Sequence, residues 1–374
     1  MVYQSATHMK VVIAGGGIIG AAIAYYLTQA GTETVVVERG ELAGEASGAA
    51  AGLLIPPDRA AAPGPFRDIC LASLALYKPV LEDVQRQSGV DAQCAASGIL
   101  VVAQSPERVS MLQAHARWQI EHGVRADWIE GRELRDLEPA LSPRVLGASF
   151  SRGELNVDPG QVTRAFAFAA KAGGADLRTN TMLTGFLGRG KRVGGVSTSL
   201  GDIEDADAVV IAAGPWTQGL AHRLGATVPT PPMRGQMIAY RTDAIKHAIW
   251  GEDGYLVPKA GGILYAGATV EDVGFRKRTT PRALAGLRQM ATTLVPSLRR
   301  TDVASEWAGL RPGSPDDQPI IGRLPGRENV YVATGHFRNG ILLAPITGKL
   351  ISQLILKGKT EMPLEPFSPA RFAN

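Results

Sequence analysis

The sequence predicts an α/β protein in which a Rossmann-like domain is interrupted by an α+β domain built on a mainly antiparallel sheet. An apolar strand, a glycine-rich turn and an apolar helix open the chain, between residues 10 and 31. Buried strands of the same kind return at residues 205–213 and 329–334. From Thr227 to Trp307, short strands alternate with turn residues, as in an antiparallel sheet.

The length of 374 residues predicts two domains. We assign residues 9–85, 150–222 and 308–366 to the Rossmann-like domain, whose glycine-rich turn indicates nucleotide binding, and residues 86–149 and 223–307 to a substrate-binding domain. The net charge of +4 is small for a chain of this size, and no basic run indicates a nucleic-acid partner.

The two cysteines, Cys70 and Cys94, lack the spacing of a metal site or of a disulfide framework. We therefore expect no bound metal and a cytoplasmic protein, and the sequence leaves a homo-oligomer open. The polar lead from Met1 to Met9 has no apolar core or cleavage site, so we expect a disordered extension there.

The opening motif points to a dinucleotide. Residues 10–14 are apolar and β-branched, as a strand buried on both faces requires. Gly15 then permits a tight turn, Gly17 lets a pyrophosphate approach the backbone, and Gly20 lets the next helix pack closely on the sheet. Glu38 ends the second strand, where a carboxylate accepts the hydroxyl groups of an adenosine ribose.

A signal peptide or a membrane anchor is the alternative interpretation, because residues 11–27 carry no charge. The triple glycine in the middle of this run and the position of Glu38, eighteen residues after Gly20, favour nucleotide binding. We therefore expect no membrane span.

The remaining elements follow from periodicity and capping signals. A loop of small residues at 44–54 leaves its backbone open to a close ligand. Asp158 and Pro159 mark the start of a helix. Further helices are expected at residues 66–88, 107–122, 281–294 and 341–356. Further strands are expected at residues 93–104, 126–129, 175–179, 236–242, 254–258 and 262–268.

Five more blocks follow the opening motif, at residues 47–52, 211–216, 232–236, 307–312 and 336–342. In this order they resemble the FAD-dependent amine oxidoreductases of the D-amino acid oxidase superfamily, over nearly the whole chain. Trp307-Ala308-Gly309-Leu310-Arg311-Pro312 and His336-Phe337-Arg338-Asn339-Gly340-Ile341-Leu342 look most like the glycine oxidase (ThiO) type.

The resemblance implies a bound FAD. No cysteine follows Cys94, so the covalent attachment known in part of the superfamily is not expected. The helix after Asn339 would point its positive end at the flavin. The residues that the resemblance assigns to the cofactor are Gly15, Gly17, Ile18, Ile19, Gly20, Glu38, Arg39, Ala46, Ser47, Ala51, Gly52, Leu53, Met182, Gly214, Trp216, His336, Phe337, Arg338, Asn339, Gly340, Ile341 and Leu342.

The resemblance also implies a substrate clamp. Arg311 matches the arginine that holds the substrate carboxylate, for which a planar guanidinium is well suited. Tyr255 matches a tyrosine that adds a hydroxyl, and Arg338 matches a second arginine near the flavin. Asp253 stands where a histidine is often found, and Val270 stands where a methionine can flank the substrate. These two departures leave the choice of amine open.

The implied reaction is the oxidation of a small amino acid, bound as its neutral amine. Hydride passes from Cα to flavin N5, the imine is hydrolysed to glyoxylate and ammonia, and dioxygen becomes hydrogen peroxide. Positioning and charge stabilisation would suffice for catalysis. Glycine is the first candidate, with a role in thiamine (thiazole) synthesis. An N-substituted glycine, sarcosine-like or an N-carboxymethyl amine, is the alternative.

Two other classes of protein share the glycine motif. A nicotinamide dehydrogenase would need a catalytic histidine or lysine in the second domain, where His247 is the only histidine and has no supporting motif. A nucleotide-binding module without catalytic activity would not need the blocks that contain Arg311 and Arg338. We therefore expect an oxidase.

Overall fold

The computed structural model describes residues 9–56, 63–121, 126–188 and 190–373. The lead at residues 1–8, which we expected to be disordered, lies outside these ranges. The first sheet has six strands, in the spatial order β19 (Ile320–Arg323), β20 (Val330–Thr334), β12 (Ala208–Ile211), β1 (Lys10–Ala14), β2 (Glu33–Val37) and β8 (Asp176–Arg178). All neighbours in it are parallel except β19 and β20.

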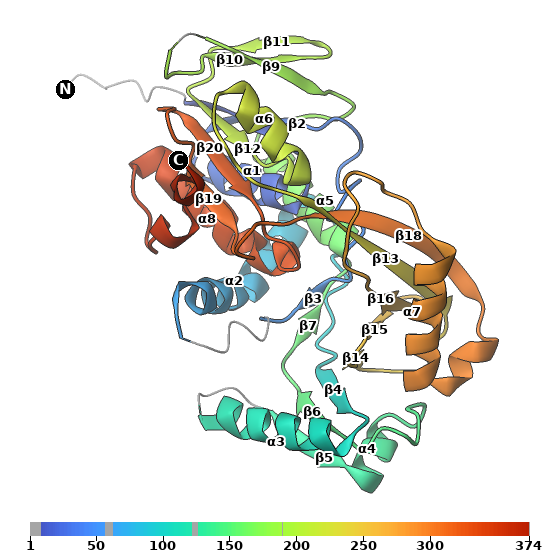
Figure 1. Ribbon diagram of the computed structural model, residues 1–374. Helices are drawn as coiled ribbons and strands as arrows, with labels where there is room; N and C mark the ends of the chain where they lie inside the picture. The colour runs from blue at the N-terminus through green and yellow to red at the C-terminus, as the bar shows by residue number, and fades with distance from the viewer. Residues whose placement is uncertain (1–8, 57–62, 122–125, 189, 374) are drawn as a thin grey trace.

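Both faces of this sheet are covered. Helices on one face contact one another in the pairs α1–α5, α1–α8, α2–α5 and α2–α8. Val11 and Ile13 of β1 are buried on that face, while Val12 is buried on the other. The helices on the first face are α1 (Ile18–Gln29), α2 (Pro65–Ser88), α5 (Pro159–Ala172) and α8 (Gly340–Lys357). On the other face, α6 (Thr217–Arg223) packs in the same core cluster as Val12. The predicted Rossmann-like domain is thus present (Figure 1).

A second sheet has nine strands and is mainly antiparallel. Its strands are β17 (Glu271–Asp272), β13 (Pro232–Arg241), β16 (Ile263–Gly267), β15 (Tyr255–Lys259), β14 (Ala248–Trp250), β4 (Ile99–Ala103), β6 (Gly147–Ser151) and β5 (Asp127–Glu130), with β18 (Val303–Pro312) paired to β13. Only β14 and β4 pair in parallel. Figure 1 shows α7 (Pro281–Leu294) along one side of this sheet, with α3 (Pro106–Glu121) and α4 (Gly131–Leu137) at its far end. We keep the two-domain division as a proposal.

Smaller elements complete the chain. A two-stranded ribbon, β3 (Leu53–Leu54) and β7 (Leu155–Asn156), lies where the two large sheets meet. A three-stranded sheet lies at the opposite end of the first domain (Figure 1). Its strands are β9 (Leu183–Leu187), β10 (Gly195–Thr198) and β11 (Gly201–Glu204), and the short 3-10 helices are η2 (Gly214–Trp216), η3 (Pro296–Arg300), η4 (Glu365–Phe367) and η5 (Pro369–Phe372).

Most predicted elements are confirmed, but several boundaries differ: the strand expected at residues 236–242 is β13, from residue 232, and the one expected at 205–213 is β12, at residues 208–211. The helix expected at residues 281–294 is α7 with the same bounds, and Asp158 caps α5 by accepting the N–H of Gln161 at 2.7 Å. The strand expected at residues 93–104 is only β4, from residue 99, because the backbone turns at Gln93 and Gly98, which both have positive φ.

One described helix, α8, is long and apolar enough to cross a membrane, but 67% of it is buried inside the protein. It packs against α1 and α2. The uncharged run at residues 11–27, the other candidate, forms β1 and most of α1 in the same core. Both segments are core elements of the folded protein.

The contact between α1 and α8 requires glycine at position 348. A Cβ on Gly348 would lie 2.8 Å from the carbonyl carbon and oxygen of Ala22. We predict that Gly348→Leu destabilises the protein by about 1–3 kcal/mol or more, as overpacking does. Denaturant unfolding measures this.

The matched control is Gly286→Leu, at an exposed position of α7 where a Cβ meets nothing within 4 Å. There the better helix propensity of leucine should raise stability by up to about 0.8 kcal/mol. If the two substitutions changed the free energy of unfolding equally, the close packing of Gly348 on α1 would not be the cause of the effect.

Candidate active site

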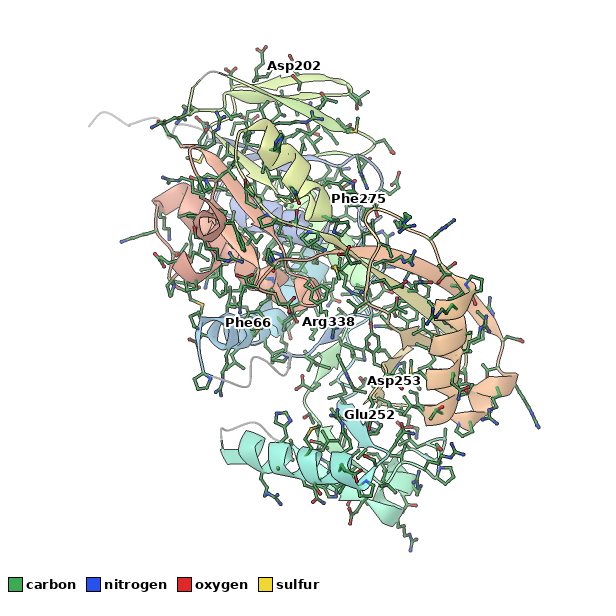
Figure 2. All side chains as sticks on the ribbon, viewed as in Figure 1. Phe66, Asp202, Glu252, Asp253, Phe275 and Arg338 are labelled. Carbon is green, nitrogen blue, oxygen red and sulfur yellow. The ribbon has the colours of Figure 1, made fainter. Side chains whose placement is uncertain are left out.

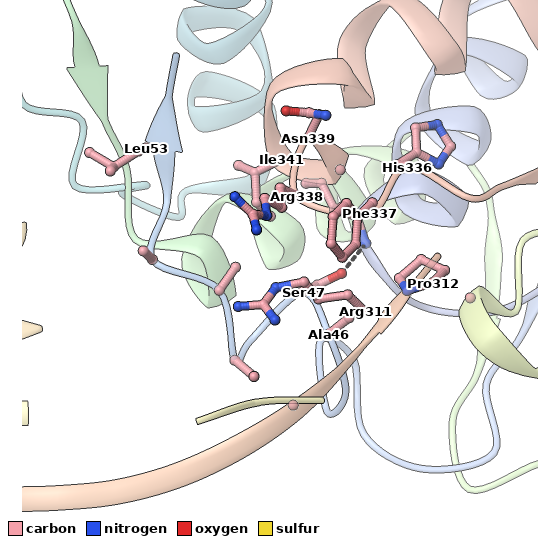
Figure 3. Close-up of a pocket in the computed structure, with 18 of the residues that line it drawn as sticks. Ala46, Ser47, Leu53, Arg311, Pro312, His336, Phe337, Arg338, Asn339 and Ile341 are labelled. Carbon is pink, nitrogen blue, oxygen red and sulfur yellow. Dashed lines mark hydrogen bonds between the residues drawn. The ribbon is translucent and has the colours of Figure 1, made fainter. Parts of the chain in front are cut away.

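One cavity of about 1220 Å³ runs between the two large sheets. It is larger than the roughly 300–1,000 Å³ that a single small ligand occupies. Its walls come from the carboxyl ends of β1 and β12, from one face of the nine-stranded sheet, and from α2 and α3. Its size suits a cofactor and a substrate together. Figure 3 shows the part near Arg311 and Arg338.

The glycine turn forms one end of the cavity. A Cβ on Gly15 would lie 2.4 Å from the Ala212 oxygen, and one on Gly20 would lie 2.0 Å from the Gly15 oxygen. The turn is therefore as tight as the motif predicted. The Ser47 hydroxyl accepts the Ile18 N–H at 2.9 Å, so Ser47 satisfies one of the free donors at the start of α1 (Figure 3).

Glu38 lies at the end of β2 and lines the cavity. One carboxylate oxygen accepts the Gly16 N–H at 2.7 Å, and the other accepts the Gly40 N–H at 2.9 Å. These bonds fix the side chain. An ionised carboxylate has about four acceptor positions, so two remain for ribose hydroxyl groups.

An aromatic and cationic stack lies beside Glu38. The Arg39 guanidinium is 3.6 Å from the centre of the Trp216 ring and pairs with Glu45 at 2.7 Å. Trp216 in turn packs against Phe275, with 5.5 Å between ring centres. Met182 also lines this end, but its N–H donates to the Ser199 hydroxyl and its carbonyl accepts the Ser199 N–H. The backbone of Met182 is thus less free for adenine than we expected.

The segment from His336 to Ile341 forms the middle of the cavity and leads into α8. His336 is 2% exposed, and its Nε2 contacts the Thr347 hydroxyl at 3.1 Å. Its Nδ1 is buried without a partner in the described chain. Burial lowers the pKa of His336 to about 3, so the ring is neutral. An unpaired polar atom at this position, together with the tight glycine turn and Glu38, fits a dinucleotide such as FAD.

Arg311, on β18, is the central charge of the substrate side. Burial lowers its pKa, the Tyr255 hydroxyl opposes this effect, and Arg338 adds to it. Burial raises the pKa of Tyr255 in turn, against the effect of the two arginines. One Arg311 N–H donates to the Thr269 carbonyl at 3.0 Å. Figure 3 shows Arg311 and Arg338 projecting into the same part of the cavity.

Within the described chain, no carboxylate forms an ion pair with Arg311. Gly235 lies on β13 two residues beyond Met233, the direct partner of Arg311, and it gives the side chain its room, because a Cβ there would lie 2.3 Å from Nη1. A buried cation without a counter-charge is unfavourable. The arrangement is therefore suited to bind an anionic group of a ligand.

A hydrogen-bond network holds the wall behind Arg311. Glu271 accepts from Arg234 at 2.5 Å, from Gln236 at 2.7 Å and from the Thr269 hydroxyl at 2.6 Å. Burial alone would raise the pKa of Glu271, but these bonds outweigh it and hold the pKa at about 2. The network fixes Thr269, whose carbonyl binds Arg311.

Nearly all sequence-predicted site residues line this cavity, including Asp253 and Val270. Gly20 and Leu342 do not. Gly20 packs under the turn, and Leu342 is buried in the core, where its carbonyl accepts the Ser73 hydroxyl. Sequence reasoning missed the lining from α2 and α3, and also Glu154, because no motif marks them. The charged or titratable lining residues that were missed are Glu45, Arg67, Arg108, His115, Glu154, Arg223 and Glu252.

Glu271 should make the free energy of unfolding of the protein depend on pH in the acidic range. Its folded pKa of about 2 is below the ordinary value of 4.5, so its contribution is complete above about pH 4.5 and is lost as the pH falls toward 2. This shift corresponds to at most roughly 3 kcal/mol. We predict that Glu271→Gln destabilises the protein at neutral pH, and that the difference from the wild type narrows between pH 4.5 and 2.

Urea unfolding at several pH values tests this prediction. The control is Glu306→Gln, which removes the partner of Arg288 in a more exposed ion pair that should contribute little. If the two variants lost the same stability at every pH, the network would not have the role that we assign to it.

Comparison with known proteins places the chain in a family. The model of FAD dependent oxidoreductases (DAO) matches residues 10–354. Glycine oxidase of Bacillus licheniformis is 35% identical over 96% of this chain and 96% of its own length. The bifunctional protein ThiO/ThiG of Synechocystis is 35% identical over 98% of this chain and 54% of its own length.

A solved structure agrees with these matches. The crystal structure of glycine oxidase from Geobacillus kaustophilus has a TM-score of 0.91 and 31% identity, and the match covers 97% of this chain and 99% of that one. The predicted resemblance, the fold class and the FAD cofactor are confirmed. The chain belongs to the family of FAD-dependent oxidoreductases.

Proposed function

We propose that this enzyme oxidises glycine, with FAD as hydride acceptor and dioxygen as final electron acceptor, and releases glyoxylate, ammonia and hydrogen peroxide. The observation that carries the proposal is the buried Arg311, without a carboxylate of the described chain and beside the Tyr255 hydroxyl. A guanidinium in this setting is suited to a small ligand that carries a carboxylate. The relatives named glycine oxidase support glycine as that ligand.

The cofactor would extend along the cavity from the Glu38 end to the segment at residues 336–341. We propose that Glu38 accepts the ribose hydroxyl groups and that the start of α1, with Ser47, receives the pyrophosphate. Residues 51–53 would flank the flavin. FAD, when bound, supplies the acceptor of the hydride and passes the electrons to dioxygen.

The side chains of this protein would act by positioning. Arg311 and Tyr255 hold the carboxylate, which fixes Cα, and Arg338 adds positive charge to the same region. The β13, β15 and β18 side of the cavity is largely apolar, with Met237 and Ala268, and would exclude water from the reacting carbon. No acid or base is needed at Cα if the amine binds in its neutral form.

The biological setting is also a proposal. The ThiO/ThiG relative supports a role in the synthesis of the thiamine thiazole. We propose a cytoplasmic location, as the cysteine usage suggests, and we leave the oligomeric state to measurement.

Peroxide formation tests the function directly. With glycine, the purified yellow protein should form one hydrogen peroxide per glyoxylate, and heating should release FAD into the supernatant. A nicotinamide cofactor should give no turnover. A colourless protein, or a flavoprotein that is not reduced by glycine, would contradict the proposal.

Arg311 should be essential for substrate binding but not for FAD. Loss of a buried partner of a carboxylate costs about 3–5 kcal/mol, which is about two to four orders of magnitude in kcat/KM. We predict this loss for Arg311→Ala, with the flavin still bound. Arg311→Lys should recover little, because the planar fork is lost.

The control is Arg241→Ala, at an exposed position of β13 away from the cavity. Its kcat/KM should equal that of the wild type. If Arg311→Ala kept more than about a tenth of the activity, equivalent to a loss of only about 1.4 kcal/mol, Arg311 would not hold the substrate.

A further inference from the structure

The cavity does not end at the proposed substrate site. It continues into a chamber between α2, α3, β4 and β6, which we call the distal chamber. Its apolar lining includes Leu71 and Leu74 of α2, Met111 of α3, and Ile99 and Val101 of β4. Leu71 and Met111 are 42% and 50% exposed, so the chamber is open enough to admit a ligand.

Glu154 lines this chamber from the segment between β6 and β7. Its carbonyl accepts the Gly98 N–H at 3.0 Å, which fixes the backbone. Leu155 and Asn156, the next two residues, pair with Leu54 and Leu53. At about 3.3 Å per residue, Glu154 lies roughly 7 Å along the ribbon from the level of Leu53, which we place beside the flavin.

The Glu154 carboxyl lacks a partner that a buried carboxyl requires. Its Oε2 is buried and accepts no hydrogen bond from the described chain. Burial raises the pKa of Glu154 to about 7, and no neighbouring charge contributes to the shift. A carboxyl in this state would be stabilised by a hydrogen-bond donor or by a cation supplied by a ligand.

The other charged groups of the chamber do not satisfy Glu154. Arg67 lines the chamber from α2, and Arg108 and His115 line it from α3. Arg67 and His115 have interactions of their own. Arg108 contacts Met111 through Nη1, and its Nε is buried without a partner in the described chain. Glu252 and Asp253, from the turn between β14 and β15, are exposed acids that also line the cavity (Figure 2).

We propose that the distal chamber is a second substrate subsite, in which Glu154 binds an ammonium or other N–H donor at the end of a short substituent on the nitrogen of a glycine. The glycine carboxylate would be held at Arg311, so this inference rests on the proposed function. The enzyme would then accept N-(aminoalkyl)glycines beside glycine itself. Glu154 is the residue that selects them.

Two isosteric substrates test the subsite. N-(2-Aminoethyl)glycine and N-propylglycine have arms of the same length, and only the first arm ends in an ammonium group. At about pH 8, above the pKa of Glu154, the wild type should prefer the aminoethyl compound in kcat/KM by at least about tenfold, the effect of one hydrogen bond to a charged group. Glu154→Gln should bring the ratio close to one and leave the kcat/KM for glycine unchanged.

The pH dependence separates binding from a purely structural role. The ratio in the wild type should rise between pH 6 and 8, as Glu154 ionises, and Glu154→Gln should remove this rise. Glu154→Asp keeps the charge and should keep part of the preference. Glu107→Gln, at an exposed position of α3, is the matched control and should behave as the wild type.

Each result decides a separate point. If glycine is oxidised but the wild type shows no preference between the two arms, the subsite is wrong while the proposed function stands. If Glu154→Gln keeps the preference, Glu154 is not the acceptor. If the wild type oxidises neither glycine nor its derivatives, the proposed function fails, and the subsite fails with it.

Discussion

The site depends on one unfavourable arrangement, a guanidinium buried in a cavity wall without a carboxylate of the described chain beside it. Such a charge is costly in the absence of a ligand, because no acid of the described chain compensates it. The same property makes it a strong and selective anion site, since a bound carboxylate supplies the missing charge and two parallel hydrogen bonds. The selection for carboxylated substrates that we propose would follow from the burial of Arg311.

Other residues of the nine-stranded sheet maintain this arrangement. Gly235 leaves the space that the guanidinium occupies, and the Glu271 network holds the Thr269 carbonyl that orients it. The carboxyl ends of β1 and β12 line the same cavity as Arg311, so that a flavin held by the glycine turn and a substrate held by Arg311 and Tyr255 would meet there. In the mechanism that we propose, the strands hold Arg311 and Tyr255 in a fixed geometry, and this positioning is the contribution of the fold.

Sequence patterns correctly predicted those elements of the fold that are determined by residues close to one another in the chain. The glycine turn, the Asp158 cap and α7 each have a local signal, and the structure contains them where that signal stands. The β9–β11 sheet was missed because its short strands are interrupted by glycines and polar residues. The roles of Arg311 and Tyr255 needed the family resemblance. Glu154 was missed because β6, α2 and α3 meet only in the folded chain, and nothing in the residues around it marks a site.

The central claim is that Arg311 receives a substrate carboxylate next to the bound flavin. A crystal structure of the FAD-loaded enzyme with acetate, which has the carboxylate but no amine to oxidise, tests it most directly. We expect the acetate carboxylate within hydrogen-bond distance of both Arg311 and Tyr255, with its methyl group facing the flavin ring. Acetate bound elsewhere in the cavity, with Arg311 paired to a carboxylate of the protein, would contradict it.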